Sequence, residues 1–535
     1  MTTATAATET GPAGVPPASW LARALGFFSG TVGFVIKIVF LAVSNALAIW
    51  AVGLLLADGH WISGGLIAVA TLLVDVVYLG PWHQTVPLKF LVPGTIFLIG
   101  FQIVPLLSNV NISFTNWSTG HNLTHQEAIA AIEENSLTPP PNGATYTSTP
   151  ARKGSELVLL LVDETTGKAY AGSKEGLTPL APADVTIQNG IVTAADGYTT
   201  VKGQELLTLD EEMGKLLIPT NGSATIRAEG LSQAVELQPT LRYVPANDTF
   251  VDIQTKTVYR DNGKGSYVSA SGEALEPGWR TYIGLANFKK IATDPLVRDP
   301  FVRVFIWTFV YAGLSVFLTF ALGLFLAIVL NKPDLRLQRL QRALLVIPFA
   351  IPAYLSVLVW GGLLNDDFGA INNLLGIHIP WLFDPTWAKV SCILVNLWLG
   401  FPYFFLVCTG ALQAIPEELT EAARVDGATP RQVFRKITLP LLLVATAPLL
   451  IASFAFNFNN FNNIYLLTGG GPLQADQAVA GSTDILISYT YKLAFQAGKG
   501  SDYGLAAAVS IIIFFIIATI SAVSFWRTKS LENLV

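Results

Sequence analysis

Long apolar runs dominate two blocks of the chain, residues 32–107 and 301–525, and a polar stretch separates the blocks. A membrane-spanning helix needs about 20 predominantly apolar residues. Eight runs meet that need, and the sequence predicts a span in each: Val32–Leu56, Trp61–Gly80, Lys89–Leu107, Val304–Leu330, Leu340–Leu363, Lys389–Leu412, Leu439–Leu467 and Tyr503–Phe525. We therefore expect an α-helical polytopic membrane protein with one large polar insert after the third span.

Within the insert, short β-branched and apolar runs alternate with turn signals such as Asn189-Gly190 and Asn262-Gly263, a pattern typical of hairpins. The pattern predicts strands at Leu157–Val162, Asp184–Ile187, Ile191–Thr193, Ala224–Ala228 and Phe250–Val258. We therefore expect an α/β or mainly β domain. The pattern leaves open whether this domain recognises an external partner or is only a solvated insertion.

The same pattern divides the chain into four parts. Residues 1–31 form an N-terminal segment, in which Met1–Ala18 is expected to be disordered and Trp20–Gly30 to lie on the membrane surface. Residues 32–110 carry spans one to three, residues 111–299 form the insert, and residues 300–535 carry spans four to eight. A polar loop, residues 413–440, connects spans six and seven.

Composition and charge agree with this division. The 535 residues are 52% hydrophobic and only 13% charged, whereas a soluble domain has about a quarter of its residues charged. The insert holds 15 Lys+Arg against 22 Asp+Glu, a formal charge of −7, while the rest of the chain carries +2. Because no basic stripe with interleaved aromatic residues occurs, nucleic-acid binding has little support. Cys392 and Cys408 share one apolar segment and are expected to be reduced and buried.

Basic residues in the short loops predict the orientation of the spans. They follow span four (Lys332, Arg336, Arg339, Arg342), span six (Arg424, Arg431, Arg435, Lys436) and span eight (Arg527, Lys529). Short loops rich in Lys and Arg stay in the cytoplasm. Both termini are therefore expected to be cytoplasmic, and the insert extracytoplasmic.

The most specific local signal lies in the loop between spans six and seven. Pro416 followed by two glutamates suits a helix start. Gly427 is placed to end that helix in the left-handed conformation. Thr429, Pro430 and Gln432 then form a capping box with proline at the first helical position. The loop is therefore expected to form a helix–Gly–helix unit, in which small Ala422 and Ala423 let another surface approach.

This loop resembles the cytoplasmic signature of the ABC-importer permease family, which is Glu-Ala-Ala, a nearby Gly, and Ile-x-Leu-Pro at a fixed distance. The matching positions are Glu421, Ala422, Ala423, Gly427, Ile437, Leu439 and Pro440. Eight spans, a large insert after the third, and the segments Val395–Tyr403 and Ser453–Phe461 resemble the MalF-type subunits of maltose/maltodextrin importers. The resemblance covers essentially the whole chain and is strongest after Phe301.

The resemblance implies a heterodimer with a MalG-like permease, two copies of a MalK-like ABC ATPase, and an extracytoplasmic sugar-binding protein. The docking loop implied for the ATPase contains Glu421, Ala422, Ala423, Asp426 and Gly427. The chain has no G-x-x-x-x-G-K-[ST] loop, so ATP must be used by the partner ATPase, and no cofactor is expected on this chain. The implied location is the bacterial or archaeal cell membrane.

A neutral sugar needs amide side chains for its hydroxyls and aromatic rings for its C–H faces. In span seven, Ser453, Phe456, Asn457 and Asn460 recur at helical spacing, as do Asn396, Gly400 and Tyr403 in span six. The matching MalF-type positions line the sugar site, which makes these seven residues the predicted sugar contacts. Polar interhelical contacts are the structural alternative. Phe349 stands where the resemblance leads us to expect a tyrosine.

Other functions have weaker support in the sequence. A permease for another neutral oligosaccharide would need the same residue types. An ion-coupled secondary transporter would need titratable groups at mid-membrane, and spans four to eight contain almost none. Asp75 and Lys37, in the first two spans, are exceptions. A membrane-anchored scaffold would leave the Glu421 motif unexplained. The sequence shows no arrangement of a nucleophile with a general base, so the chain is not expected to be an enzyme. His121 and His125 could share a helix face, but no further ligand completes a metal site.

Overall fold

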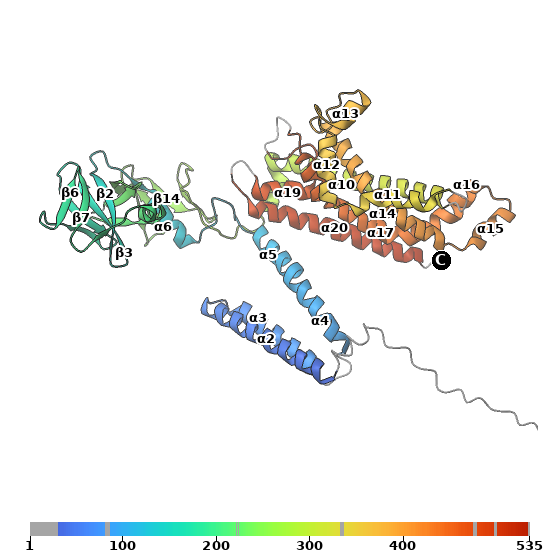
Figure 1. Ribbon diagram of the computed structural model, residues 1–535, viewed down its shortest axis with the longest axis horizontal. Helices are drawn as coiled ribbons and strands as arrows, with labels where there is room; N and C mark the ends of the chain where they lie inside the picture. The colour runs from blue at the N-terminus through green and yellow to red at the C-terminus, as the bar shows by residue number, and fades with distance from the viewer. Residues whose placement is uncertain are drawn as a thin grey trace, which may run out of the picture. The chain divides into compact units, whose positions relative to one another are not determined.

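The computed structural model describes residues 30–80, 86–220, 222, 224–331, 336–473, 479–496 and 500–532 (Figure 1). The predicted segment Met1–Ala18, nearly all of Trp20–Gly30, and Lys332 lie outside the described residues. The chain divides into two compact units, residues 1–107 and 108–535, and each is described by itself.

The first unit contains an antiparallel pair of helices, α2 (Gly30–Ala57) and α3 (Trp61–Leu79), and most of the third span. That span continues through α4 (Val86–Leu98), the π-helical segment η2 (Ile99–Ile103) and α5 (Val104–Ser113). The amide of Asn45 donates to Asp75 Oδ1 at 2.9 Å, and Lys37 Nζ donates to the Tyr78 carbonyl at 3.3 Å. The two charged groups that the sequence singled out in this unit therefore have hydrogen-bond partners within it.

The helical core of the second unit carries the remaining spans (Figure 1). These are α10 (Pro295–Leu330), the pair α11 (Gln338–Ala350) and α12 (Ala353–Leu363), α14 (Pro385–Ala414), the pair α17 (Leu439–Phe458) and α18 (Phe461–Thr468), and α20 (Tyr503–Glu532). Among the described residues, seven helices are long and apolar enough to span a membrane, or eight with the bent pair counted as one span. The polytopic fold is confirmed.

The span predicted at Leu340–Leu363 is not one continuous helix. Helices α11 and α12 meet at an angle of 92°. Ile351 at the break has an extended backbone, with ψ of 135°, because a residue before proline is driven out of the helical region and Pro352 has no N–H to continue the ladder. The non-helical backbone at this bend lies beside the other spans.

Small residues allow the central pair of helices, α10 and α14, to pack closely. A Cβ on Gly323 of α10 would lie 2.7 Å from the backbone carbon of Phe404 in α14. A Cβ on Gly400 of α14 would lie 2.8 Å from Thr319 Cγ2 in α10. Glycine removes the steric barrier at both contacts, as is common between membrane helices.

The insert is mainly β, as one of the two predicted alternatives. Its strands are β1 (Leu137–Thr138), β2 (Thr145–Lys153), β3 (Glu156–Asp163), β4 (Ala169–Ser173), β5 (Gly176–Pro179), β6 (Val185–Gln188), β7 (Ile191–Ala195), β8 (Thr199–Thr200), β9 (Leu217–Pro219), β10 (Thr225–Glu229), β11 (Gln233–Pro239), β12 (Leu241–Val244), β13 (Thr249–Asp252), β14 (Val258–Asp261) and β15 (Tyr267–Ser269). The central sheet runs β5-β4-β3-β2-β11-β10-β9, with β1 beside β11 and β8 beside β2. A four-stranded sheet, β12-β13-β14-β15, and the hairpin β6-β7 complete it.

Four of the five predicted strands are confirmed, and the fifth, Phe250–Val258, is wrong as a single strand. The chain turns between β13 and β14, because Asp252 Oδ1 accepts hydrogen bonds from the backbone N–H groups of Gln254 and Thr255 at 2.8 and 2.7 Å. This turn competes with the extended conformation that the β-branched residues favour. The Asn189-Gly190 turn has positive φ at both residues and closes the β6–β7 hairpin as expected.

Short helices complete the second unit. Those of the insert and its base are α6 (His125–Asn135), α7 (Gln204–Thr208), α8 (Asp210–Lys215) and α9 (Ala286–Thr293). Those of the helical core are α13 (Ala370–Leu375), α15 (Glu417–Val425), α16 (Pro430–Val433) with the π-helical segment η3 (Phe434–Thr438), and α19 (Leu486–Phe495). Helix α19 is not among the predicted elements, because its 10 residues are too few to give a membrane-span signal.

Candidate functional site

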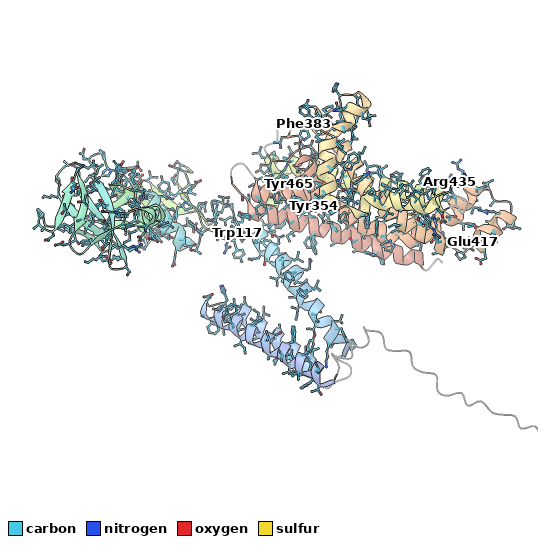
Figure 2. The ribbon with its side chains drawn as sticks, in the orientation of Figure 1. Trp117, Tyr354, Phe383, Glu417, Arg435 and Tyr465 are labelled. Atoms are coloured by element: carbon cyan, nitrogen blue, oxygen red, sulfur yellow. The ribbon has the colours of Figure 1, made fainter. Side chains whose placement is uncertain are left out.

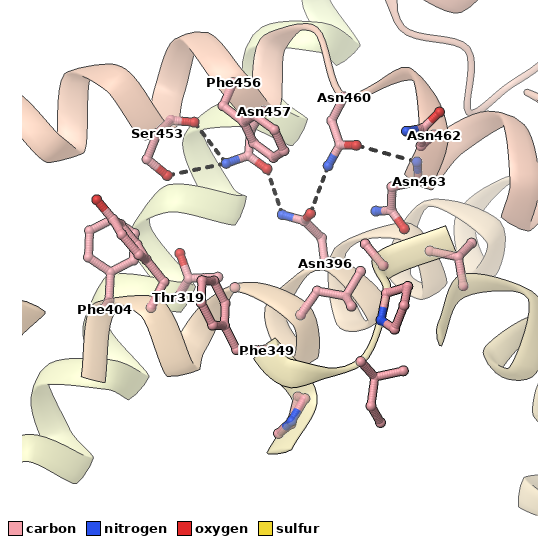
Figure 3. Close-up of a pocket in the computed structure, with 18 of the residues that line it drawn as sticks. Thr319, Phe349, Asn396, Phe404, Ser453, Phe456, Asn457, Asn460, Asn462 and Asn463 are labelled. Atoms are coloured by element: carbon pink, nitrogen blue, oxygen red, sulfur yellow. Dashed lines mark hydrogen bonds between the residues drawn. The ribbon is translucent and has the colours of Figure 1, made fainter. Parts of the chain in front are cut away.

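A cavity of about 650 Å³ lies in the helical core, between α14, the α17–α18 pair and the bend of α11 and α12 (Figure 3). All seven residues predicted to contact sugar line it: Asn396, Gly400, Tyr403, Ser453, Phe456, Asn457 and Asn460. The fold therefore brings the two sequence segments to one place. Their role in sugar binding stays a prediction at this point.

A row of carboxamides crosses the cavity wall (Figure 3). Asn396 Nδ2 donates to Asn457 Oδ1 at 2.8 Å, and Asn460 Nδ2 donates to Asn396 Oδ1 at 3.0 Å. Asn457 Nδ2 in turn donates to the Ser453 carbonyl at 2.8 Å. The Asn396 side chain thereby joins α14 to both parts of the broken span. Each amide has N–H groups that donate and an oxygen that accepts, so each can form hydrogen bonds with sugar hydroxyls.

Asn460 does not share a helix with Asn457, contrary to the prediction. The helix stops at Asn459, and Asn460 is the N-cap of α18, where its Oδ1 accepts from the Asn463 backbone N–H at 3.3 Å. Asparagine competes for backbone hydrogen bonds in this way and favours helix starts over helix interiors. The side chain nevertheless reaches the cavity, because the break turns it toward Asn396.

The cavity also offers apolar surface and a backbone approach. Phe456 is 68% exposed and Phe349 is 57% exposed, so both rings present free faces. Tyr403 is half-buried next to Phe404, with ring centroids 5.2 Å apart. Gly400 places bare backbone at the wall. The lining therefore combines aromatic faces with amides, the combination that stacks on C–H faces and binds hydroxyls.

Several lining residues are absent from the sequence prediction. Asn462 and Asn463 follow Asn460, and Thr319 comes from α10. Asn463 continues the three-residue spacing of Asn457 and Asn460, so that spacing was the signal that could have found it. Its Nδ2 donates to the Tyr311 hydroxyl at 2.7 Å and to the Cys392 carbonyl at 3.1 Å. Thr319 had no signal of its own, because its neighbour across the helix contact is 81 residues away in the sequence.

The residues that line the cavity include no Asp, Glu, Lys, Arg or His. A charged ligand buried there would therefore lack a counter-charge, which is costly in a low-dielectric site. The geometry favours a neutral ligand with several hydroxyl groups.

Both cysteines of the chain are buried free thiols.

The predicted helix–Gly–helix unit forms in the loop between spans six and seven, and it projects from one end of the helical core (Figure 1). Helix α15 ends before Gly427, whose φ is +82°. Thr429 and Gln432 form the predicted capping box at the start of α16. Helix α15 buries none of its residues, and Val425 is 87% exposed. Figure 2 shows Glu417 and Arg435 at this projecting end.

The two histidines of the insert have structural roles. His121 precedes α6 and His125 is its first residue, so the two histidines do not share a helix face. His121 binds the hydroxyls of Ser118 and Ser266, at 3.1 and 2.9 Å, and burial lowers its pKa. Within the part of the chain that the structure describes, no three His, Cys, Asp or Glu side chains form a group able to hold a metal.

Comparisons with known proteins identify the family of the chain. Residues 319–533 match the family described as binding-protein-dependent transport system inner membrane component. Residues 96–175 match the N-terminal part of the membrane subunit in transporters that depend on a periplasmic binding protein.

The solved structure of a bacterial ABC transporter involved in alginate import is similar to 46% of this chain and 84% of its own, with 23% identity and a TM-score of 0.40. The maltose/maltodextrin transport system permease protein MalF of Escherichia coli K12 is 36% identical over 497 residues, which are 90% of this chain and 94% of the relative. MalF of Klebsiella aerogenes is 36% identical over 501 residues, again 90% and 94%. The chain therefore belongs to the family of MalF-type permease subunits of binding-protein-dependent ABC importers.

Proposed function

We propose that this chain transports maltose and maltodextrins, as the names of its relatives state for those proteins, and that the sugar binds in the cavity lined by the amide row. The observation that supports this most directly is the uncharged cavity, in which carboxamides and aromatic rings surround about 650 Å³. Another neutral oligosaccharide would use the same groups.

As an ABC permease, the chain is not an enzyme and binds no cofactor, and a separate ATPase subunit hydrolyses ATP. It is a multi-pass protein of the bacterial inner membrane type. We place both termini in the cytoplasm and the insert outside, on the basis of the basic loops. The partners are then a MalG-like permease, two copies of a MalK-like ATPase, and a sugar-binding protein that docks outside.

The loop that contains Glu421 is the proposed contact with the ATPase. Its helix α15 buries no residue, and its apolar Leu419 and Val425 are 45% and 87% exposed. Closure of the ATPase dimer would pull this loop and its counterpart in the second permease together, and the two permeases would rock outward around the cavity. The cavity would thereby open in turn to the inside and to the outside, which is alternating access.

The amide row keeps free hydrogen-bonding capacity for a sugar. Asn396 donates one hydrogen bond to Asn457 and accepts one from Asn460. Each amide has two N–H groups and two acceptor lone pairs, so a hydroxyl can bind the groups that these contacts leave unused.

Changing Asn457 to Ala tests the site. The variant loses one amide that serves both as donor and as acceptor, and we expect the half-saturation constant for sugar uptake to rise about tenfold, with the complex still assembled. Uptake is measured in vesicles that contain the complete transporter. Asn459→Ala is the matched control, since Asn459 is exposed next to the row and is not among the lining residues. Unchanged uptake kinetics in N457A would contradict the proposal that sugar binds in this cavity.

A further inference from the structure

The bend between α11 and α12 contributes main chain to the wall of the amide cavity. Six consecutive residues line the cavity there, from Pro348 to Ala353, and Phe349 is the labelled one (Figure 3). Successive residues of a continuous helix point about 100° apart, so six in a row cannot all face one cavity through their side chains. None of the six side chains can form a hydrogen bond. Any hydrogen bond to this part of the wall must therefore use the backbone.

The backbone at this bend has carbonyl groups that the helices leave unpaired. Helix α11 ends at Ala350, and the last carbonyls of a helix have no N–H of that helix to bind. Ile351 and Pro352 are extended, with ψ of 135° and 125°, so the hydrogen-bond ladder stops before α12 begins. In the part of the chain that the structure describes, the carbonyls of Pro348 and Ile351 accept no backbone hydrogen bond.

Unpaired backbone groups need an explanation inside a membrane span. They are costly in hydrocarbon, and they are tolerated where protein buries them or where they line an aqueous cavity. Phe349 is 57% exposed and Ile351 is 39% exposed, so protein does not cover this stretch of backbone. The amide cavity is then the place where these carbonyls meet water or a ligand.

We infer that the carbonyls at the end of α11 accept hydrogen bonds from hydroxyl groups of the sugar, in the same cavity as the amide row. The inference rests on the proposed function and adds to it a part of the site that is made of backbone. A hydroxyl group both donates and accepts, so a bound sugar donates to the carbonyls and accepts from amide N–H groups. A carbonyl only accepts, and it therefore requires a donor at one position of the sugar.

Maltoses in which fluorine replaces one hydroxyl group test this requirement. Fluorine can accept a weak hydrogen bond but has no proton to donate, so it leaves a carbonyl unpaired. We expect at least one monofluorinated maltose to have a half-saturation constant for uptake about tenfold above that of maltose. The ratio of the two constants is measured in vesicles that contain the complete transporter. Because the same binding protein serves every variant, a change in this ratio between variants belongs to the permease.

Pro352→Ala changes the state of the carbonyls without changing a polar side chain. Alanine supplies an N–H at position 352 and frees Ile351 to adopt the helical conformation, so the ladder of α11 can continue and occupy the carbonyls. The tenfold ratio should therefore fall to about twofold or less. Pro352→Gly also supplies the N–H, and it replaces P352A if that variant does not assemble.

Pro448→Ala is the matched control, because Pro448 lies inside the continuous helix α17 and is not among the lining residues. It should keep the ratio of the original chain. The same ratio in P352A as in the original chain would overturn the role of the carbonyls, and so would the absence of any fluorinated maltose with a raised constant. Asn457→Ala separates two failures: if N457A imports normally, the proposed sugar site fails, and if N457A is impaired while P352A keeps the original ratio, the carbonyl acceptors alone fail.

Discussion

At the scale of residues, the sequence predicted which side chains meet in the cavity, but not how they bind one another. Asn396 and Asn457 are 61 residues apart. Their polarity within apolar spans marked both, and the resemblance to MalF-type permeases assigned them to one site. The helix break at Asn459 was not predicted, because a run of apolar and amide residues has the same composition whether or not the helix is continuous. Asn463 was missed, although its spacing matched, because only the folded structure shows its contacts with α10 and α14.

A buried ion pair holds the loop after α18. Lys492 Nζ and Asp484 Oδ2 are 2.7 Å apart, and their side chains are 9% and 0% exposed. Asp484 also accepts from the Gly481 N–H at 2.6 Å and from Ser488 Oγ at 2.8 Å. Its oxygens thus have partners from three residues. Such a pair is costly to break by removing one partner, because the other charge stays buried.

We predict that Lys492→Met destabilises the protein by about 3–5 kcal/mol, because Asp484 is left as an uncompensated buried charge. Asp484→Asn combined with Lys492→Met should recover part of this loss, since no charge remains. Thermal denaturation of the purified complex measures both. Lys290→Met is the matched control: its partner Asp502 lies at 3.4 Å in a partly exposed pair, which contributes only about 0–1 kcal/mol. Equal effects of K492M and K290M would contradict the prediction.

At the scale of elements, hydropathy located the spans, whereas proline and packing decided their shapes. The bend of 92° between α11 and α12 follows from Ile351-Pro352, a signal that was present in the sequence but was outweighed by the apolar run around it. The loop between spans six and seven was predicted more accurately, because its capping residues act locally. Thr429, Pro430 and Gln432 need no distant partner to start a helix.

We predict that Gly427→Pro uncouples ATP hydrolysis from uptake. Gly427 has a φ of +82° and its N–H donates to the Arg424 carbonyl at 3.0 Å, whereas proline fixes φ near −65° and has no N–H. The loop must therefore change its shape, but no Cβ contact restrains the site, so the membrane fold should remain. The ratio of sugar imported to ATP hydrolysed in vesicles should fall roughly tenfold.

Gly427→Asn is the control in the same experiment, because it changes the residue without changing the backbone conformation. Asparagine adopts the left-handed conformation more readily than other non-glycine residues and keeps the N–H. Coupling in this variant should stay near that of the original chain. Normal coupling in the proline variant would argue against a docking role for this loop.

At the scale of the whole molecule, the negative insert and the apolar remainder were clear from the sequence, and the attachment between them was not. The attachment uses backbone and small polar groups: Thr119 N–H donates to the Ser501 carbonyl at 2.9 Å, and Ser501 N–H donates to Thr119 Oγ1 at 2.7 Å. A Cβ on Gly504 would lie 2.3 Å from the Thr115 carbonyl oxygen. Such contacts have no hydropathy signal, because they depend on close approach and not on residue class.

These contacts attach the base of the insert, at residues 115–119, to the chain at the start of α20. We predict that the attachment stays closed during transport. A disulfide between Thr119→Cys and Ser501→Cys, in a chain in which Cys392 and Cys408 are replaced by Ala, should therefore leave sugar uptake within about twofold of its value in the reduced state. Uptake is compared before and after reduction in the same vesicles, with each single-cysteine variant as control. If oxidation abolishes uptake and reduction restores it, the attachment must open during the transport cycle.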